Sequence, residues 1–166
     1  APGSDMRFCK FHGFGNDYIV IEKDHVPSNR SLPALAKAIC HRHTGAGADG
    51  IAVIERIEAG DADFFCEIVN PDGSIAGFSG NGTRCAVSYT YYKNLWTEPN
   101  LRLKVRSGIK NYRSIEADPA GRYLFEAEIG PPDFTSAGVP VRTEQPQDSV
   151  IDFLVEAAGR EFPMSC

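Results

Sequence analysis

The fold is decided by one stretch of the chain, Ser79-Gly-Asn-Gly-Thr-Arg-Cys-Ala-Val-Ser-Tyr-Thr-Tyr-Tyr92. After Arg84 no charged residue occurs until Lys93, so the stretch is apolar or weakly polar on nearly every side. A helix with this composition is buried on nearly every side. The sequence therefore predicts a central helix from Thr83 to about Leu95, wrapped by other elements.

Short strands dominate the rest of the chain. Runs rich in β-branched and aromatic residues, bounded by Gly, Pro, Asn and Asp, predict strands at 6–12, 18–21, 51–54, 63–69, 101–105, 110–117, 123–128 and 150–157. The first two runs flank a polar turn and predict a hairpin. Apolar residues at helical spacing predict a second helix at 32–41. Mostly antiparallel strands wrapped around a central buried helix give an α+β fold rather than alternating βαβ units.

Length and charge exclude several function classes. A chain of 166 residues holds one domain, or at most two small ones. The 17 basic and 22 acidic residues leave a net charge of −5, which argues against binding nucleic acid by neutralising phosphates. No apolar run approaches the roughly 18 residues that span a bilayer, and no secretory signal pattern occurs. We therefore expect neither a nucleic acid nor a membrane as partner.

The cysteines indicate a reducing compartment. There are five, at positions 9, 40, 66, 85 and 166, with no Cys-x-x-Cys pair among them. An odd number without paired spacing is not typical of a disulfide framework or of a structural zinc site. The pattern predicts free thiols, no metal and a cytoplasmic location.

The two ends of the chain differ in character. Residues 1–5 read as a tail or cloning remnant, and residues 6–166 as a single domain. The last residues, 161–166, read as the start of a strand rather than as a polar terminus. We therefore expect the chain to be part of a longer protein.

Two glycine-rich segments are candidates for binding. Gly45–Gly50 fits the pattern G-x-G-x-x-G, but a dinucleotide site needs a strand before it and a helix after it. The order here is reversed, which favours a helix-to-strand turn.

Ser79–Gly82 begins the buried helix, where free backbone N–H groups form a site for a carboxylate or phosphate. A serine or asparagine that only caps the helix is the alternative.

Four motifs occur in order along the chain, namely His12-Gly-Phe-Gly-Asn-Asp-Tyr18, Arg42-His-Thr-Gly-Ala-Gly-Ala-Asp-Gly50, Asn70-Pro-Asp-Gly73 and Ser79-Gly-Asn-Gly-Thr-Arg-Cys85. Taken singly, the first and third are explained by turn chemistry. Together the four closely resemble the N-terminal half of the diaminopimelate epimerase family, which belongs to the cofactor-independent amino-acid epimerases and racemases. The resemblance runs from Met6 to the C-terminus.

The resemblance implies an activity and a domain architecture. The family interconverts LL- and meso-diaminopimelate, a step toward lysine and peptidoglycan, with no metal and no pyridoxal phosphate. Two pseudo-symmetric domains each supply one cysteine across a cleft. One thiolate removes the α-proton, and the other thiol delivers a proton to the opposite face. In each domain strands surround a central helix, which agrees with the buried helix expected above.

The resemblance also implies roles for individual residues. By motif match, Asn16 and Asn70 contact the substrate, while Gly80 and Asn81 help to bind its α-carboxylate. Hydrogen bonds from backbone N–H groups stabilise the charge that builds when the α-carbon loses its proton. Ser79 stands where the family has its catalytic cysteine.

This serine changes the expected activity. A cysteine thiol has a pKa of about 8.5, and a helix N-terminus lowers this pKa. A serine hydroxyl is far less acidic and is a poor base. The family's second cysteine and the residues that hold the far end of the substrate belong to its C-terminal domain, and none of their motifs occurs here. We expect little two-base epimerase activity from this chain, even with a second domain.

Two other functions stay open. One is a related racemase or isomerase acting on another amino acid. The other is a degenerate, non-catalytic binding protein that kept the fold, which Ser79 favours. In each case the expected partner is a small-molecule amino acid. An isolated half exposes its inter-domain face, so we also expect self-association, and a homodimer is one form that it can take.

Overall fold

The computed structural model describes residues 6–128, 130–139 and 141–165. Contacts divide the chain into two compact units, Ala1–Ile129 and Gly130–Cys166, and each is described by itself. The single domain expected at 6–166 stays a prediction. The tail expected at 1–5 and the thiol of Cys166 lie outside the described residues.

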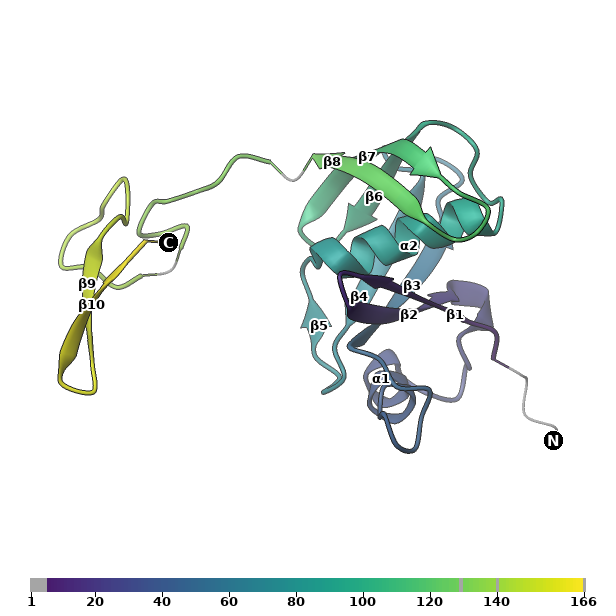
Figure 1. Ribbon diagram of the computed structural model, residues 1–166, viewed down its shortest axis with the longest axis horizontal. Coiled ribbons are helices and arrows are strands. Elements are labelled where there is room, and N and C mark those ends of the chain that lie inside the picture. The colour runs from purple at the N-terminus through teal and green to yellow at the C-terminus, as the bar shows by residue number, and fades with distance from the viewer. Residues whose placement is uncertain (1–5, 129, 140, 166) are drawn as a thin grey trace. The chain divides into compact units, whose positions relative to one another are not determined.

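The first unit contains every helix and strand that the sequence predicts for it, with shifted ends (Figure 1). The helices are α1 (Leu32–Ile39), α2 (Gly80–Tyr92) and the short 3-10 helix η1 (Lys23–His25). The strands are β1 (Cys9–Gly13), β2 (Asn16–Glu22), β3 (Gly50–Arg56), β4 (Phe64–Val69), β5 (Ile75–Ala76), β6 (Asn100–Val105), β7 (Gly108–Ala117) and β8 (Tyr123–Glu128). Of these, η1 and β5 were not expected from the sequence.

These strands form one mixed sheet. Its order is β1-β2-β3-β4-β6-β7-β8, with β5 paired to β4. The hairpin predicted at the N-terminus is confirmed, because β1 and β2 pair antiparallel. Two pairs, β2 with β3 and β4 with β6, are parallel. Parallel neighbours need a long crossover, and α1 and α2 each lie within one. The α+β class is confirmed, while these two βαβ crossovers were not predicted.

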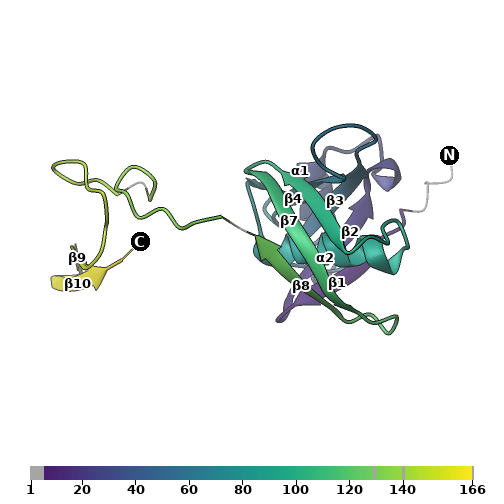
Figure 2. The ribbon, with the colours of Figure 1, turned by 90° about the horizontal axis from the view of Figure 1, so that it is seen from above.

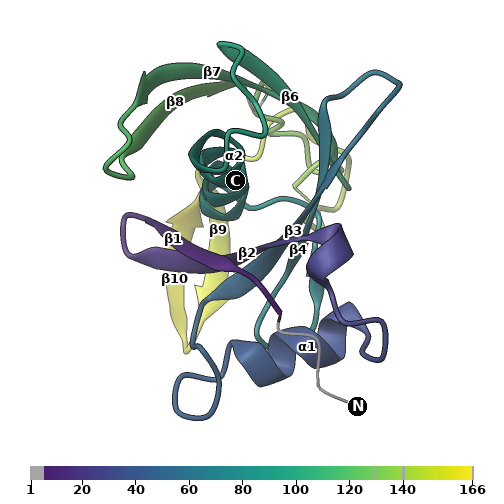
Figure 3. The same ribbon diagram turned by 90° about the vertical axis from the view of Figure 1, so that its right-hand side faces the viewer.

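Strand β2 is buried on both faces. Tyr18 and Val20 belong to an apolar cluster with α2, whereas Ile19 and Ile21 belong to a second cluster with α1. Figure 3 shows the two helices on opposite sides of β2 and β3. Successive side chains of a strand point to opposite faces, so this run of apolar residues supplies both clusters.

Strands β6 to β8 cover another side of α2. Leu101, Leu103 and Tyr112 lie in the same buried cluster as Cys85 and Val87 of α2. Figure 2 looks onto β7 and β8, behind which α2 runs. Helix α2 therefore lies between the β1–β2 hairpin and the strands β6 to β8, and the N-terminus of α2 lies beside the first residues of β2.

The second unit holds one antiparallel pair of strands among its described residues, β9 (Phe153–Ala157) with β10 (Arg160–Met164). These strands confirm the strand expected near 150–157 and the one expected at the chain end. In the preceding loop, the Ser136 hydroxyl accepts a hydrogen bond from the Gln147 N–H at 2.9 Å. Across both described units, no helix is long and apolar enough to span a membrane.

Candidate active site

Ser79 caps the N-terminus of α2. Its backbone is extended (φ −141°, ψ 116°), and its Oγ accepts a hydrogen bond from the Gly82 N–H at 3.1 Å. The capping role that the sequence left open is therefore confirmed. The N–H groups of Gly80 and Asn81 lie in the first turn, where no helical carbonyl precedes them to accept a bond. They stay available for an anion at the positive end of the helix dipole.

Tyr18 reaches this N-terminus from β2. Its hydroxyl oxygen lies 3.0 Å from Ser79 Oγ, and the residue is 5% exposed. A Cβ added to Gly50 would lie 2.7 Å from the ring carbon Cε1 of Tyr18, and one added to Gly82 would lie 2.9 Å from the same carbon. Glycine at both positions therefore leaves the room that the ring occupies.

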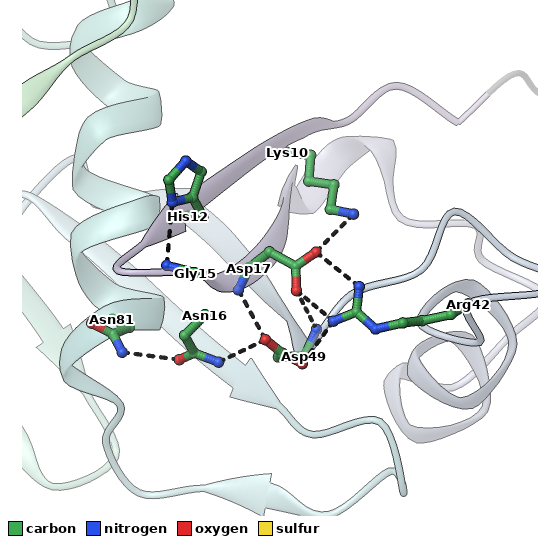
Figure 4. Close-up of polar contacts among 8 residues, drawn as sticks. All are labelled: Lys10, His12, Gly15, Asn16, Asp17, Arg42, Asp49 and Asn81. Atoms are coloured by element: carbon green, nitrogen blue, oxygen red, sulfur yellow. Dashed lines mark hydrogen bonds and ion pairs between the residues drawn. The ribbon is translucent and has the colours of Figure 1, made fainter.

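Asn16 joins three of the four motifs (Figure 4). Its amide nitrogen donates to Asp49 Oδ2 at 2.9 Å, and its Oδ1 accepts from the Asn81 amide nitrogen at 3.1 Å. The Arg84 guanidinium in turn donates to Asn81 Oδ1. Residues 65 positions apart thus touch directly beside Ser79. The structure brings Asn16, Ser79, Gly80 and Asn81 of the predicted site together.

A charged network anchors the start of β2. Asp17 accepts from Arg42 at 2.7 Å and pairs with Lys10 Nζ at 2.7 Å. Arg42 also bridges to Asp49 at 2.8 Å, and the Asp49 N–H donates to Asp17 Oδ1 at 3.2 Å. The Arg42 guanidinium, followed by Lys10 and Asp49, holds the pKa of Asp17 well below its usual range despite partial burial. This network ties the second motif to the first.

The chain is expected to lose stability in acid as Asp17 is protonated. Because its pKa is lower in the folded chain than in the unfolded chain, the stabilisation is complete above the unfolded-state pKa and is lost as pH falls toward the folded-state pKa. Melting temperatures measured from about pH 6 to about pH 2 should fall less steeply for Asp17→Asn. As a control, Asp61→Asn removes a carboxylate that is 67% exposed and 3.6 Å from Lys104, and it should keep the original slope. An unchanged slope in Asp17→Asn contradicts this role.

Asn70 hydrogen bonds within its own turn. Its amide nitrogen donates to Ser74 Oγ at 2.9 Å, its backbone N–H donates to the Ser74 carbonyl, and its carbonyl accepts from the Gly73 N–H. No described contact joins it to Ser79 or Asn16. Its contact with substrate therefore stays a prediction, while its role in the turn is confirmed.

Three of the four described thiols are buried, and burial makes each of them a poor source of thiolate. Cys85 is 2% exposed, and burial raises its pKa to about 11. Burial likewise raises the pKa of Cys40 to about 11 and raises that of Cys66 further. Cys9 is half-buried on β1. Cys66 and Cys85 belong to one buried cluster and Cys40 to the other, while Cys9 packs against the first.

The Gly45–Gly50 segment connects α1 to β3, as predicted. The Gly47 N–H donates to the Ile39 carbonyl at 3.0 Å, and Gly47 has a φ of +74°, which favours glycine. A cavity of about 650 Å³ adjoins α2, and its lining includes the β1–β2 turn at residues 12–14, Arg84 and Cys85 of α2, and residues of β8. Within the described ranges, no cluster of three or more His, Cys, Asp or Glu side chains forms a metal site.

Comparison with known sequences identifies the family. The sequence profile described as diaminopimelate epimerase matches residues 8–134. The chain belongs to the diaminopimelate epimerase family. It is 32% identical over 162 residues to the diaminopimelate epimerase of Halothermothrix orenii, covering 98% of the chain and 56% of that protein. It is 34% identical over 163 residues to that of Azotobacter vinelandii, covering 96% and 55%. The chain spans about half the length of these relatives.

Solved structures support the fold of this diaminopimelate epimerase family member. A methylitaconate-delta-isomerase matches with a TM-score of 0.56 at 12% identity, over 95% of the chain and 49% of that structure. A hydroxyproline epimerase from Agrobacterium vitis matches with a TM-score of 0.52 at 15% identity, over 68% and 38%. At these identities the likeness concerns the fold alone.

Sequence reasoning missed four residues of this candidate site. No role was given to four residues that lie within the quoted motifs, namely Asp17, Tyr18, Arg42 and Asp49. One signal was available. Asp17 and Asp49 each directly precede the apolar run of a buried strand, and in a parallel pair such residues meet at one sheet edge.

Proposed function

We propose that the chain forms one side of a diaminopimelate epimerase active site, on α2 and the start of β2. In this scheme LL- and meso-diaminopimelate interconvert by two-base proton transfer, in which one group removes the α-proton and another protonates the opposite face. Strands wrap α2 as the central helix of this domain, and the second acid–base group comes from a C-terminal domain. Membership of the family supports the scheme.

One observation carries the assignment of the site: Asn16 and Asn81 touch beside the Ser79 cap. The N–H groups of Gly80 and Asn81 bind the α-carboxylate, where the helix dipole favours negative charge. Carbanion charge spreads onto that carboxylate when the α-proton leaves, so the same donors stabilise the transition state. The Asn16 and Asn70 side chains contact the substrate.

Position 79 is where the proton is transferred. The side chain of Ser79 lies at the same helix N-terminus as the proposed carboxylate donors. A serine hydroxyl has no accessible anion near neutral pH, so the chain binds substrate on this side but deprotonates it poorly.

Ser79 also favours a second candidate, a binding protein that kept the fold without the reaction. A racemase or isomerase for another amino acid remains the third. Calorimetric titration with meso-diaminopimelate, proline and lysine tests which amino acid the chain binds. Our proposal predicts saturable binding of diaminopimelate in preference to proline. Preferential binding of proline supports the third candidate, and binding of no amino acid contradicts our proposal.

A further inference from the structure

Tyr18 contacts the side chain of Ser79 from outside α2. Its hydroxyl oxygen lies 3.0 Å from Ser79 Oγ, and no other described residue hydrogen bonds to that hydroxyl. The Gly82 N–H approaches the same Oγ at 3.1 Å. Position 79 is therefore held by two polar groups, one from the helix and one from β2.

The surroundings of Tyr18 leave its ring little freedom. The residue is 5% exposed and begins the parallel pairing of β2 with β3, opposite Gly50. A Cβ at Gly50 or Gly82 would come within 3.0 Å of the ring. A rigid ring places its hydroxyl reproducibly, which is what a positioning group requires.

We propose that Tyr18 is a positioning residue for the acid–base group at position 79, to which its hydroxyl donates a hydrogen bond. This inference rests on the proposed function of that position. With two donors, Tyr18 O–H and Gly82 N–H, an anion at position 79 is stabilised where the α-proton is taken up. In the chain as it stands, Ser79 Oγ accepts hydrogen bonds from the Tyr18 hydroxyl and the Gly82 N–H. Its own hydroxyl proton then points away from these two groups.

The proposal concerns stabilisation of an anion at position 79. The test therefore places a cysteine there, because a thiol ionises in an accessible pH range and a serine hydroxyl does not. Ser79→Cys gives a chain in which the reaction of that thiol with iodoacetamide can be followed by peptide mass spectrometry. The thiolate attacks the methylene carbon and iodide leaves, so the rate against pH reports the thiol pKa. We expect that pKa to lie below the ordinary value of cysteine, because of the helix N-terminus and the two donors.

Adding Tyr18→Phe to Ser79→Cys removes one donor and keeps the ring. A hydrogen bond to a charged group is worth enough to change the thiolate fraction about tenfold. The alkylation rate at about pH 7 should therefore fall on the order of tenfold, with a midpoint at higher pH.

The matched control is Tyr112→Phe in the Ser79→Cys chain. Tyr112 is also buried, and its hydroxyl donates to Thr83 Oγ1 at 2.6 Å in the first turn of α2. Thr83 Oγ1 in turn donates to the Ser79 carbonyl at 2.7 Å, and no described hydrogen bond joins Tyr112 to the Ser79 hydroxyl. This variant should lose comparable stability and keep the original pH midpoint. Equal midpoints with and without the Tyr18 hydroxyl overturn the inference, and so does an equal shift in the control.

A second readout serves if Tyr18→Phe unfolds. In the unmodified chain, the Tyr18 hydroxyl proton should give a slowly exchanging NMR resonance with a nuclear Overhauser effect to the β-protons of Ser79. Ser79→Ala should shift or abolish it. A rapidly exchanging hydroxyl in the folded chain contradicts the inference. Neither readout uses diaminopimelate, so failure of the inference is distinguishable from failure of substrate binding.

Discussion

Replacing Ser79 with cysteine will raise epimerase activity on the order of 10²- to 10⁴-fold, the usual contribution of a positioned acid–base group. The gain is expected in a protein that joins this chain to the second domain of a relative, because two-base transfer needs a group on each face of the substrate. The physical reason is acidity. A thiol at a helix N-terminus is partly ionised near neutral pH, and a hydroxyl is not.

The measurement is the rate at which LL-diaminopimelate is converted to the meso form. Ser79→Ala is the control, since it removes the hydroxyl and adds no thiol, and it should stay at the level of the serine protein. A Ser79→Cys protein that is folded, binds diaminopimelate and shows no gain contradicts the proposed role of position 79.

Replacing Gly50 with alanine will lower the free energy of unfolding by about 2 to 3 kcal/mol, because it overpacks the core. The added Cβ would lie 2.7 Å from Tyr18 Cε1 and 3.0 Å from the Val69 carbonyl oxygen. A backbone oxygen in a buried sheet cannot move aside as the end of a flexible side chain can. The ring must then shift, which also displaces the hydroxyl from Ser79.

Urea denaturation measures this loss, and Gly77→Ala is the matched control. Gly77 is exposed, and a Cβ there would meet nothing within 4 Å, so the control should change stability by less than about 0.5 kcal/mol. If Gly50→Ala is as stable as the control, the result contradicts the close packing of the Tyr18 ring against β3.

Local patterns predicted most elements of the first unit. The uncharged run after Arg84 marked α2, and the turn before Tyr18 marked the β1–β2 hairpin. Strand pairing was harder to predict, because the parallel partners of β2 and β4 follow only after helical crossovers. A short strand has a similar local sequence pattern whether its neighbour in the sheet is parallel or antiparallel. The residues of β2 and β4 therefore did not reveal which kind of partner each strand has.

In the candidate site, too, the local feature was predicted from the sequence and the contact between distant residues was not. The capping role of Ser79 is local and was predicted as one of two alternatives, because its hydroxyl accepts from an N–H only three positions further along the chain. The contact between Asn16 and Asn81 joins distant parts of the chain, and only the tertiary fold brings them together. Turn chemistry explained Asn16 and Asn70 equally well from the sequence. The structure separates them, because Asn16 crosses to other motifs and Asn70 bonds within its own turn.

The central claim is that the first turn of α2 binds the α-carboxylate, and an NMR titration of the chain tests it most directly. The three ligands are meso-diaminopimelate, lysine, which keeps one α-carboxylate, and 1,5-diaminopentane, which has none. We predict that the first two shift the amide resonances of Gly80 and Asn81 and leave the distant Gly121 amide in place, while the diamine shifts none of them. Equal shifts with the diamine, or no shift at Gly80 and Asn81 with saturating diaminopimelate, would contradict the claim.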